Sequence, residues 1–311
     1  MAFTNASGYQ NLAQGNFTPQ IFSQKVQKFF RRASVVEDIT NTDYAGEIEN
    51  FGDTVKIIKE PTITVKDYAR GQTVDTQVLA DDQITMTVGQ GSYFAFKVDD
   101  IEERQSHVNF EALATSSGAY SLKRNYDYNV LKFIYDNATN GTSTGTDASP
   151  IDGDAAVDTL ANLVSTLKKN LDKNDVPEEN RWLVSSPEFF EQLRKAGGKL
   201  SDQSVMNDGA ASQIRNGKVT DRPLFGFNMY QSNAIAVSGG SAAAHTFGSA
   251  GATEHIFLYG HMSGVATVNH IAKTELIRDP DSFADVVRGL HVFGRKILRS
   301  EAVQRGVITI G

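Results

Sequence analysis

Four β-branched segments between residues 53 and 98 lie on either side of a polar stretch, and this arrangement constrains the fold more than any other feature of the chain. The polar stretch, 67–82, holds four aspartates, Arg70 and Gly71, with little that could be buried. Because β-branched and aromatic residues favour strands, the pattern predicts a long two-stranded excursion with a charged tip. An isolated two-stranded ribbon is marginal in water, so the projection must rest on other structure. The four predicted strands are 54–58, 62–66, 83–88 and 93–98.

A long helix is predicted directly after this ribbon. Asp99 and Asp100 favour a helix start, because carboxylates complement the dipole at a helix N-terminus. Helical periodicity continues to about residue 136, which corresponds to about 57 Å at 1.5 Å per residue. Ser116, Ser117 and Gly118 interrupt the pattern, and glycine with serine is a known cause of kinks, so we expect a bend there.

Helices and strands alternate in the middle of the chain. Residues 152–172 carry apolar side chains at helical spacing, which indicates an amphipathic helix. A buried strand is predicted at 181–185, followed by Ser186 as N-cap and Pro187 as the first helical residue. Strands at both ends of the chain, with this alternation between them, indicate an α+β fold. The remaining predicted strands are 226–237, 254–259, 263–269, 290–298 and 303–310.

Composition excludes several classes of chemistry. The 311 residues include no cysteine, which excludes disulfides, a thiolate nucleophile and cysteine-containing metal sites. The formal net charge is -7, and an acidic chain argues against sequence-specific DNA binding, because neutralising phosphates supplies much of that affinity. No segment approaches the roughly 18 apolar residues of a membrane span, and the N-terminus shows no secretory signal. We therefore expect a cytosolic, non-membrane protein.

No set of residues predicts catalysis, a cofactor or a metal. The six histidines lack metal-binding spacing, and the glycine-containing segments lack the pattern of a phosphate-binding loop. Asp279, Asp281 and Asp285 could form an acidic site, but Pro280 and Phe283 among them indicate a loop leading into a helical turn. The sequence gives no positive sign of an enzyme.

Several short segments, in a specific order, resemble tailed-phage major capsid proteins with the Hong Kong 97-type fold. The resemblance covers most of the chain, with one departure at Phe293, where tyrosine is more usual. It implies a structural coat protein that assembles into the icosahedral head shell around packaged double-stranded DNA. The segments that carry it are 17–23, 34–36, 41–44, 46–48, 52–55, 217–219, 226–233 and 288–296.

The resemblance also implies a division of the chain into named parts. The E-loop corresponds to the ribbon predicted above, and the spine helix to the long helix. The implied parts are an N-arm at 1–35, a first peripheral-domain segment at 36–49, the E-loop at 50–98, the peripheral domain with its spine helix at 99–146, an axial domain at 147–271, and C-terminal peripheral strands at 272–311.

Assembly contacts are expected from two charged groups. In the E-loop these are Lys66, Asp67 and Arg70. The helix predicted after Pro19 has a cationic side, and there they are Lys25, Arg31 and Arg32. These charges could equally serve only to keep the segments soluble, since exposed pairs contribute about 0–1 kcal/mol each. The bend at residues 116–118 is expected to change as the shell matures.

The resemblance implies partners and a location as well. The chain would form pentamers and hexamers of itself, use a portal and a separate scaffolding protein, allow for a decoration protein, and enclose double-stranded DNA without sequence-specific binding. It would be made and assembled in the host bacterial cytoplasm and end in the virion capsid. Two alternatives stay open: an encapsulin-type nanocompartment shell with the same fold, and a soluble enzyme whose site is dispersed in sequence.

Overall fold

A computed structural model gives the fold. It describes residues 34–44, 54–61, 63–74, 76–78, 83–100, 110–143, 145, 154–194, 226–235, 254–280 and 282–310. The α-helices are α1 (Val36–Ile39), α3 (Phe110–Asn137), α4 (Asp154–Lys173) and α5 (Pro187–Arg194). The strands are β1 (Thr54–Ile58), β2 (Gln83–Thr87), β3 (Gln90–Asp99), β4 (Thr139–Asn140), β5 (Arg181–Ser185), β6 (Phe227–Gln231), β7 (Glu254–His261), β8 (Val265–Arg278), β9 (Ala284–Ile297) and β10 (Val303–Thr309).

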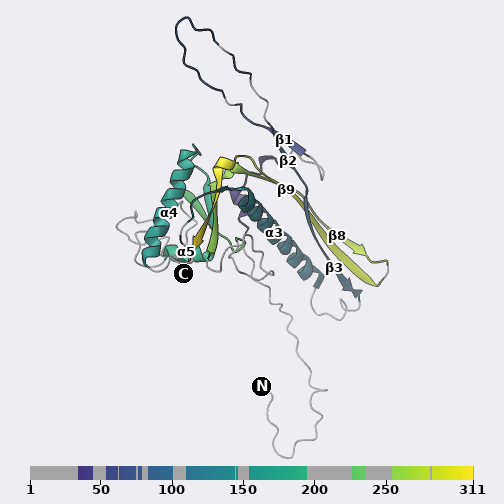
Figure 1. The fold of residues 1–311 in the computed structure, drawn as a ribbon. Helices are drawn as coiled ribbons and strands as arrows, with labels where there is room; N and C mark the ends of the chain where they lie inside the picture. Colours follow the sequence, from purple (N-terminus) through teal and green to yellow (C-terminus); the bar gives the residue numbers. More distant parts are fainter. Residues whose placement is uncertain are drawn as a thin grey trace, which may run out of the picture.

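A five-stranded sheet with strand order β4-β10-β7-β5-β6 forms one part of the molecule. Helices α4 and α5 cover one of its faces (Figure 1). The apolar stripe predicted for 152–172 is buried against this face, and it consists of Leu160, Leu163, Val164, Leu167 and Leu171. Burying a leucine or valine fully contributes about 1.5–3 kcal/mol, so this stripe fixes the helix to the sheet.

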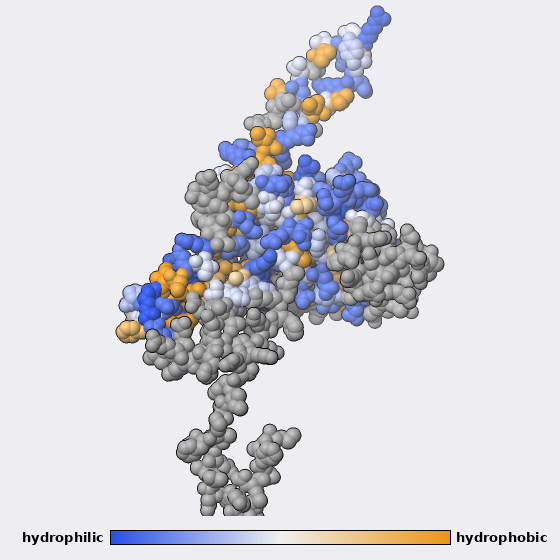
Figure 2. Space-filling view, turned by 180° about the vertical axis from the view of Figure 1, so that it is seen from behind, coloured by the Kyte–Doolittle hydropathy of each residue, from blue (hydrophilic) through white to orange (hydrophobic). Residues whose placement is uncertain are grey.

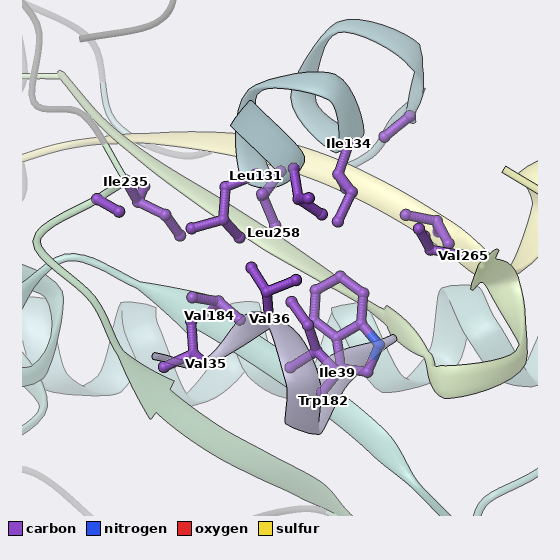
Figure 3. Close-up of a cluster of buried hydrophobic side chains, with 14 of the residues drawn as sticks. Val35, Val36, Ile39, Leu131, Ile134, Trp182, Val184, Ile235, Leu258 and Val265 are labelled. Carbon is purple, nitrogen blue, oxygen red and sulfur yellow. The ribbon is translucent and has the colours of Figure 1, made fainter. Parts of the chain in front are cut away.

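The opposite face of the same sheet packs on α1 and α3. Figure 3 shows Val36 and Ile39 of α1 lying beside Trp182 of β5, with Leu131 and Ile134 of α3 above them. All five side chains are at most 1% exposed. This core joins the N-terminal part of the described chain to the spine helix and the sheet.

A second sheet of three strands, in the order β3-β9-β8, extends away from the first along α3 (Figure 1). Strands β8 and β9 form a long antiparallel hairpin, with a register irregularity between Asn269 and Ile271. The ribbon β1–β2 rests on this sheet at its base, because Met86 and Val88 pack on Val292 and Val268. The support that the sequence required for the ribbon is therefore present.

Several predicted elements differ in extent from the observed ones. Of the strand predicted at 62–66, the described residues 63–66 pair with no other described segment as a strand. Strands β8 and β9 are longer than predicted, and β6 is shorter. Of the two residues expected to start the long helix, Asp99 ends β3 and Asp100 is helical. The expected helical turn near Asp285 is wrong, because this residue lies in β9, after a tight connection from β8. Long hairpins gain from neighbours across the sheet, which local sequence patterns do not contain.

The sheet topology also bears on the implied division of the chain. The boundary between 271 and 272 falls inside β8, and β10 pairs with β7 in the five-stranded sheet. The last strand thus lies apart from β8 and β9, although all were placed in one C-terminal segment. Among the described residues, no helix is long and apolar enough to cross a membrane.

Candidate assembly surfaces

The ribbon projects far from the body of the molecule (Figure 1). Its base is a regular antiparallel pair in which Thr54 lies opposite Thr87 and Ile58 opposite Gln83. Beyond that base, the described residues of the two arms, 63–69 and 72–78 without 75, form no strand pairs with each other. The resemblance implies an E-loop at residues 50–98, and from here on we use the label E-loop for the described residues of 54–87, which form this projection.

A tight turn forms the tip of the E-loop. The backbone N–H of Gln72 donates to the carbonyl of Ala69 at 3.0 Å, and Gln72 Oε1 accepts from the Ala69 N–H at 3.1 Å. Gly71 has φ +90°, the value that a type II turn requires at its third residue and that glycine adopts without strain. Arg70 therefore lies at the outermost point, and Lys66 and Asp67 lie on the adjacent arm, all three exposed.

Apolar side chains are also exposed along the E-loop, which the sequence reading of a charged, soluble tip missed. Val65 and Val78 are both 92% exposed. Figure 2 shows hydrophobic side chains among hydrophilic ones along the whole projection. The alternating β-branched residues of 62–66 and 74–78 were the available signal. The exposed apolar residues of the loop are Ile58, Ile63, Val65, Tyr68, Val74 and Val78.

The remaining predicted assembly residues belong to the N-arm and to the long helix. Lys25, Arg31 and Arg32 lie outside the described residues. Helix α3 is helical without a break through Ser116, Ser117 and Gly118. Gly118 also has a packing role, because a Cβ there would lie 2.9 Å from ring carbons of Phe94.

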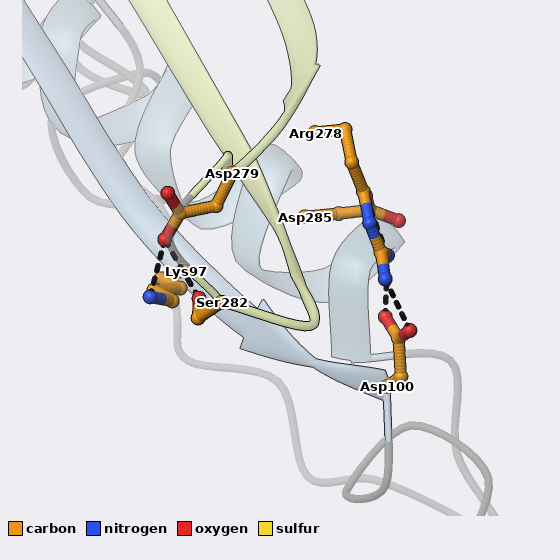
Figure 4. Close-up of polar contacts among 6 residues, drawn as sticks. All are labelled: Lys97, Asp100, Arg278, Asp279, Ser282 and Asp285. Atoms are coloured by element: carbon orange, nitrogen blue, oxygen red, sulfur yellow. Dashed lines mark hydrogen bonds and ion pairs between the residues drawn. The ribbon is translucent and has the colours of Figure 1, made fainter.

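The connection between β8 and β9 carries a polar network at the far end of the three-stranded sheet (Figure 4). Arg278 donates through Nη1 and Nη2 to the two carboxylate oxygens of Asp100, at 2.6 and 2.5 Å, and also to Asp285 at 3.1 Å. These bonds raise the pKa of the Arg278 guanidinium. On the other side, Asp279 accepts from Lys97 and from the Ser282 hydroxyl. The carboxylates considered for an acidic site are therefore paired with cations, except Asp281, which lies outside the described residues.

Phe283 lies in the same β8–β9 connection, and its aromatic side chain is 81% exposed. Its backbone is held in place, because the Asp100 N–H donates to the Phe283 carbonyl at 3.1 Å. The network thus ties the end of β3 to the β8–β9 connection.

A serine, a histidine and a glutamate meet near the start of α5, but not as a catalytic triad. Ser186 Oγ lies 3.3 Å and Glu188 Oε2 lies 3.6 Å from the same atom, Nδ1 of His255. A triad needs the serine hydroxyl and the carboxylate on opposite ring nitrogens of the histidine. Burial also lowers the pKa of His255, which keeps the ring neutral. No group of three metal-binding side chains occurs in the part of the chain that the structure describes.

Comparisons with known proteins decide the family. A family model described as phage capsid protein matches residues 81–306. The chain belongs to this family. It is a structural major capsid protein of the tailed-phage kind, and the predicted α+β fold of the Hong Kong 97 type is confirmed. No curated protein sequence matches the chain.

Solved structures agree with this assignment. The chain is 27% identical to one from Mycobacterium phage Che8, covering 94% of this capsid protein and 98% of that chain, with a TM-score of 0.78. The capsid of cyanophage P-SCSP1u is 18% identical, with 95% and 94% covered and a TM-score of 0.72. The mature capsid of bacteriophage PhiM1 is 16% identical, with 98% and 99% covered and a TM-score of 0.69. These matches favour a phage capsid over an encapsulin shell or a soluble enzyme.

Proposed function

We propose that this capsid protein closes into an icosahedral shell of pentamers and hexamers that encloses the packaged double-stranded DNA of a tailed phage, and that it catalyses no reaction. The observation that carries the proposal is the E-loop, which exposes six large apolar or aromatic side chains on a projection from the body. Exposed apolar groups of this kind mark interaction sites.

A neighbouring subunit covers the exposed apolar side chains of the E-loop in this proposal. Apolar area removed from water contributes about 25 cal/mol per Å², so covering the E-loop on a neighbour stabilises each contact substantially. Lys66, Asp67 and Arg70 add about 0–1 kcal/mol each at most, and they matter because every contact is repeated around a closed shell. The apolar residues therefore supply most of the contact energy, and the charges select the register.

The N-arm at 1–35 is proposed to lie along another subunit, with Lys25, Arg31 and Arg32 making charged contacts. The shell would use a portal and a separate scaffolding protein, with room for a decoration protein, and assemble in the host bacterial cytoplasm. A net charge of -7 suits an inner wall that repels packed DNA, so that the genome slides in and out.

A change in helix bend during maturation stays part of the proposal. Helix α3 would bend differently at Ser116–Gly118 in precursor and mature shells. Phe94 lies against Gly118, so a change in bend there must move this ring or the helix past it. Equal curvature of α3 in density maps of both states would remove this role.

The first experiment is light scattering coupled to size exclusion on the purified chain, with negative-stain microscopy of the largest species. We expect closed polyhedral particles, or rings of five and six subunits. A monodisperse monomer that stays unassembled even with a candidate scaffold would contradict the shell.

A charge reversal tests the E-loop separately. Arg70→Glu should leave the circular dichroism spectrum unchanged but reduce particle yield, because the tip residue is exposed and touches no core. Lys169→Glu, an exposed reversal on α4, serves as the matched control. Equal yields of the two variants would remove Arg70 from the contact.

A further inference from the structure

His261 lies at the point where the chain passes from one sheet to the other. It ends β7 of the five-stranded sheet, and after the short 3-10 turn Met262–Gly264 the chain enters β8 of the three-stranded sheet. Gly264 is buried, and its carbonyl accepts the N–H groups of Leu298 and Arg299 at 2.9 and 3.3 Å. The second connection between the sheets, from β9 to β10, is therefore bonded to the same turn.

The side chain of His261 caps this turn. Nδ1 of its ring lies 3.1 Å from the backbone nitrogen of Ser263 and 2.7 Å from the Ser263 hydroxyl. A backbone N–H can only donate, so Nδ1 must accept and carries no proton. The closed turn thus requires a neutral imidazole ring whose proton is on Nε2.

The groups around His261 favour the neutral ring in the folded chain. Arg181 lies opposite His261 in the β5–β7 pair, and Arg299 lies in the β9–β10 connection. Burial, with these two cations, lowers the pKa of His261, whereas a hydrogen bond with the backbone of Glu179 raises it. A proton on the ring is therefore disfavoured while the turn is closed. The carboxylates of the adjoining elements are exposed, namely those of Asp172, Glu178, Glu179 and Glu301.

We propose that His261 is a pH-sensitive switch at the joint between the two sheets. With the ring neutral, the turn Met262–Gly264 is closed and fixes the three-stranded sheet against the five-stranded sheet. A proton that binds Nδ1 takes the lone pair that accepts the Ser263 N–H, and the Ser263 hydroxyl then accepts the new ring N–H. The backbone N–H of Ser263 loses its acceptor, the turn opens, and the angle between the sheets changes. The switch is a property of the single subunit and does not depend on the proposed shell.

Hydrogen exchange in the full chain tests the opening of the turn. The amides of Ser263 and Leu298 report the closed turn, and their protection factors are compared at pH 7.5 and 5.5 after correction for the intrinsic exchange rate. A histidine in the open turn titrates near pH 6.5. Because the open turn binds the proton more tightly than the closed turn, its population should rise about tenfold between these pH values. Both protection factors should fall by the same factor.

His261→Asn is the decisive variant, because asparagine is among the best N-cap residues and does not titrate. Its Ser263 and Leu298 amides should keep their protection at pH 5.5. His291→Phe removes a histidine outside the turn and is the matched control, which should show the full tenfold loss. An equal loss in His261→Asn and in the unmodified chain would overturn the switch. If His261→Asn does not fold, His261→Ser takes its place, since serine is an equally good N-cap.

A distance measurement on the unassembled subunit tests the movement of the sheets. The chain has no cysteine, so spin labels attach only at introduced ones. Ala95→Cys on β3 and Ser165→Cys on α4 are both exposed and place one label on each side of the joint. We expect the distance distribution between the labels to shift or broaden from pH 7.5 to 5.5, and to stay constant when His261→Asn is added. Identical distributions at both pH values in the chain that keeps His261 would overturn the change of angle.

Discussion

Phe94 of β3 lies directly opposite Gly289 of β9, and its ring also lies against Gly118 of α3. One aromatic side chain thus fills the space that two glycines leave between the sheet and the spine helix. Because a Cβ at either position would enter the ring, these glycines are required for packing and not for a turn.

Replacing Gly289 with alanine should destabilise the subunit by about 1–3 kcal/mol, the usual cost of overpacking a filled site. Chemical denaturation of the unassembled subunit measures this change in the free energy of unfolding. Gly91→Ala is the matched control on β3, where nothing lies within 4 Å of a new Cβ, so its effect should stay within about 0.5 kcal/mol. If Phe94 is the obstacle, Gly289→Ala should cost less in a Phe94→Leu background, and equal costs in both backgrounds would contradict this account.

Arg181 is a buried cation that holds the connection between α4 and β5. It is 1% exposed and donates to Asp172 at 2.6 Å and to the carbonyl of Pro177 at 2.8 Å, with a further bond to Val176. Arg181→Met should cost about 2–4 kcal/mol, because it leaves buried carbonyls without donors. Asp172→Asn keeps the carbonyl bonds and should cost less. Urea unfolding measures both variants. If Arg181→Met lowers the free energy of unfolding less than Asp172→Asn does, the arginine is dispensable.

Subunit stability should fall as the pH drops from 7.5 to 5.5. Burial lowers the pKa of His255, His261 and His291 in the folded chain, whereas an unfolded histidine titrates near pH 6.5. Below about pH 6.5 the unfolded chain binds more protons than the folded chain. The free energy of unfolding is therefore highest above that pH, and it falls as the pH approaches the lower pKa values of the folded chain. His291→Phe should reduce this dependence, since it removes one such group and keeps a ring between Tyr126 and Phe293. Urea unfolding midpoints measured at several pH values test this prediction. If the midpoint depends on pH equally in the unmodified chain and in His291→Phe, the role of His291 is refuted.

Arg278→Gln should weaken the attachment of the β8–β9 connection to the end of β3 without unfolding the subunit. The guanidinium ties Asp100 to Asp285, but all three groups are exposed enough that the global stability changes by less than about 1 kcal/mol. The amide of Asp100, which donates to Phe283, should exchange its hydrogen faster than in the unmodified chain. Arg288→Gln breaks a pair with Glu275 elsewhere on the same hairpin and is the control. An unchanged hydrogen-exchange rate at the Asp100 amide would show that backbone hydrogen bonds alone hold the β8–β9 connection.

Local patterns predicted the elements whose signals lie within a few residues. The apolar stripe of α4, the N-cap and proline that start α5, and the apolar run of β5 each specify an element without reference to the rest of the chain. The bounds of β8 and β9 were predicted poorly, because a 14-residue hairpin is stabilised by pairing across its whole length. The helical turn expected near Asp285 failed for the same reason.

The predicted assembly residues show the same limit. The sequence located the E-loop and its charged tip, but it gave no measure of which side chains stay exposed, so Val65 and Val78 were overlooked in favour of Lys66 and Arg70. Exposure is a property of what lies nearby in space, and among the described residues no part of the subunit body covers Val65 or Val78.

By itself, the sequence determined the α+β class, the order of the main helices and strands, and the family, because these follow from periodicity, turn residues and short ordered segments. Only the tertiary structure decided that β10 joins β7, that Phe94 fills the gap between Gly118 and Gly289, and that β8 has β9 as its one strand partner among the described strands. Each of these features depends on contacts between segments far apart in the chain. The free energy of such a contact combines the entropy cost of closing the loop with the gain from burying apolar surface, and local sequence patterns contain neither.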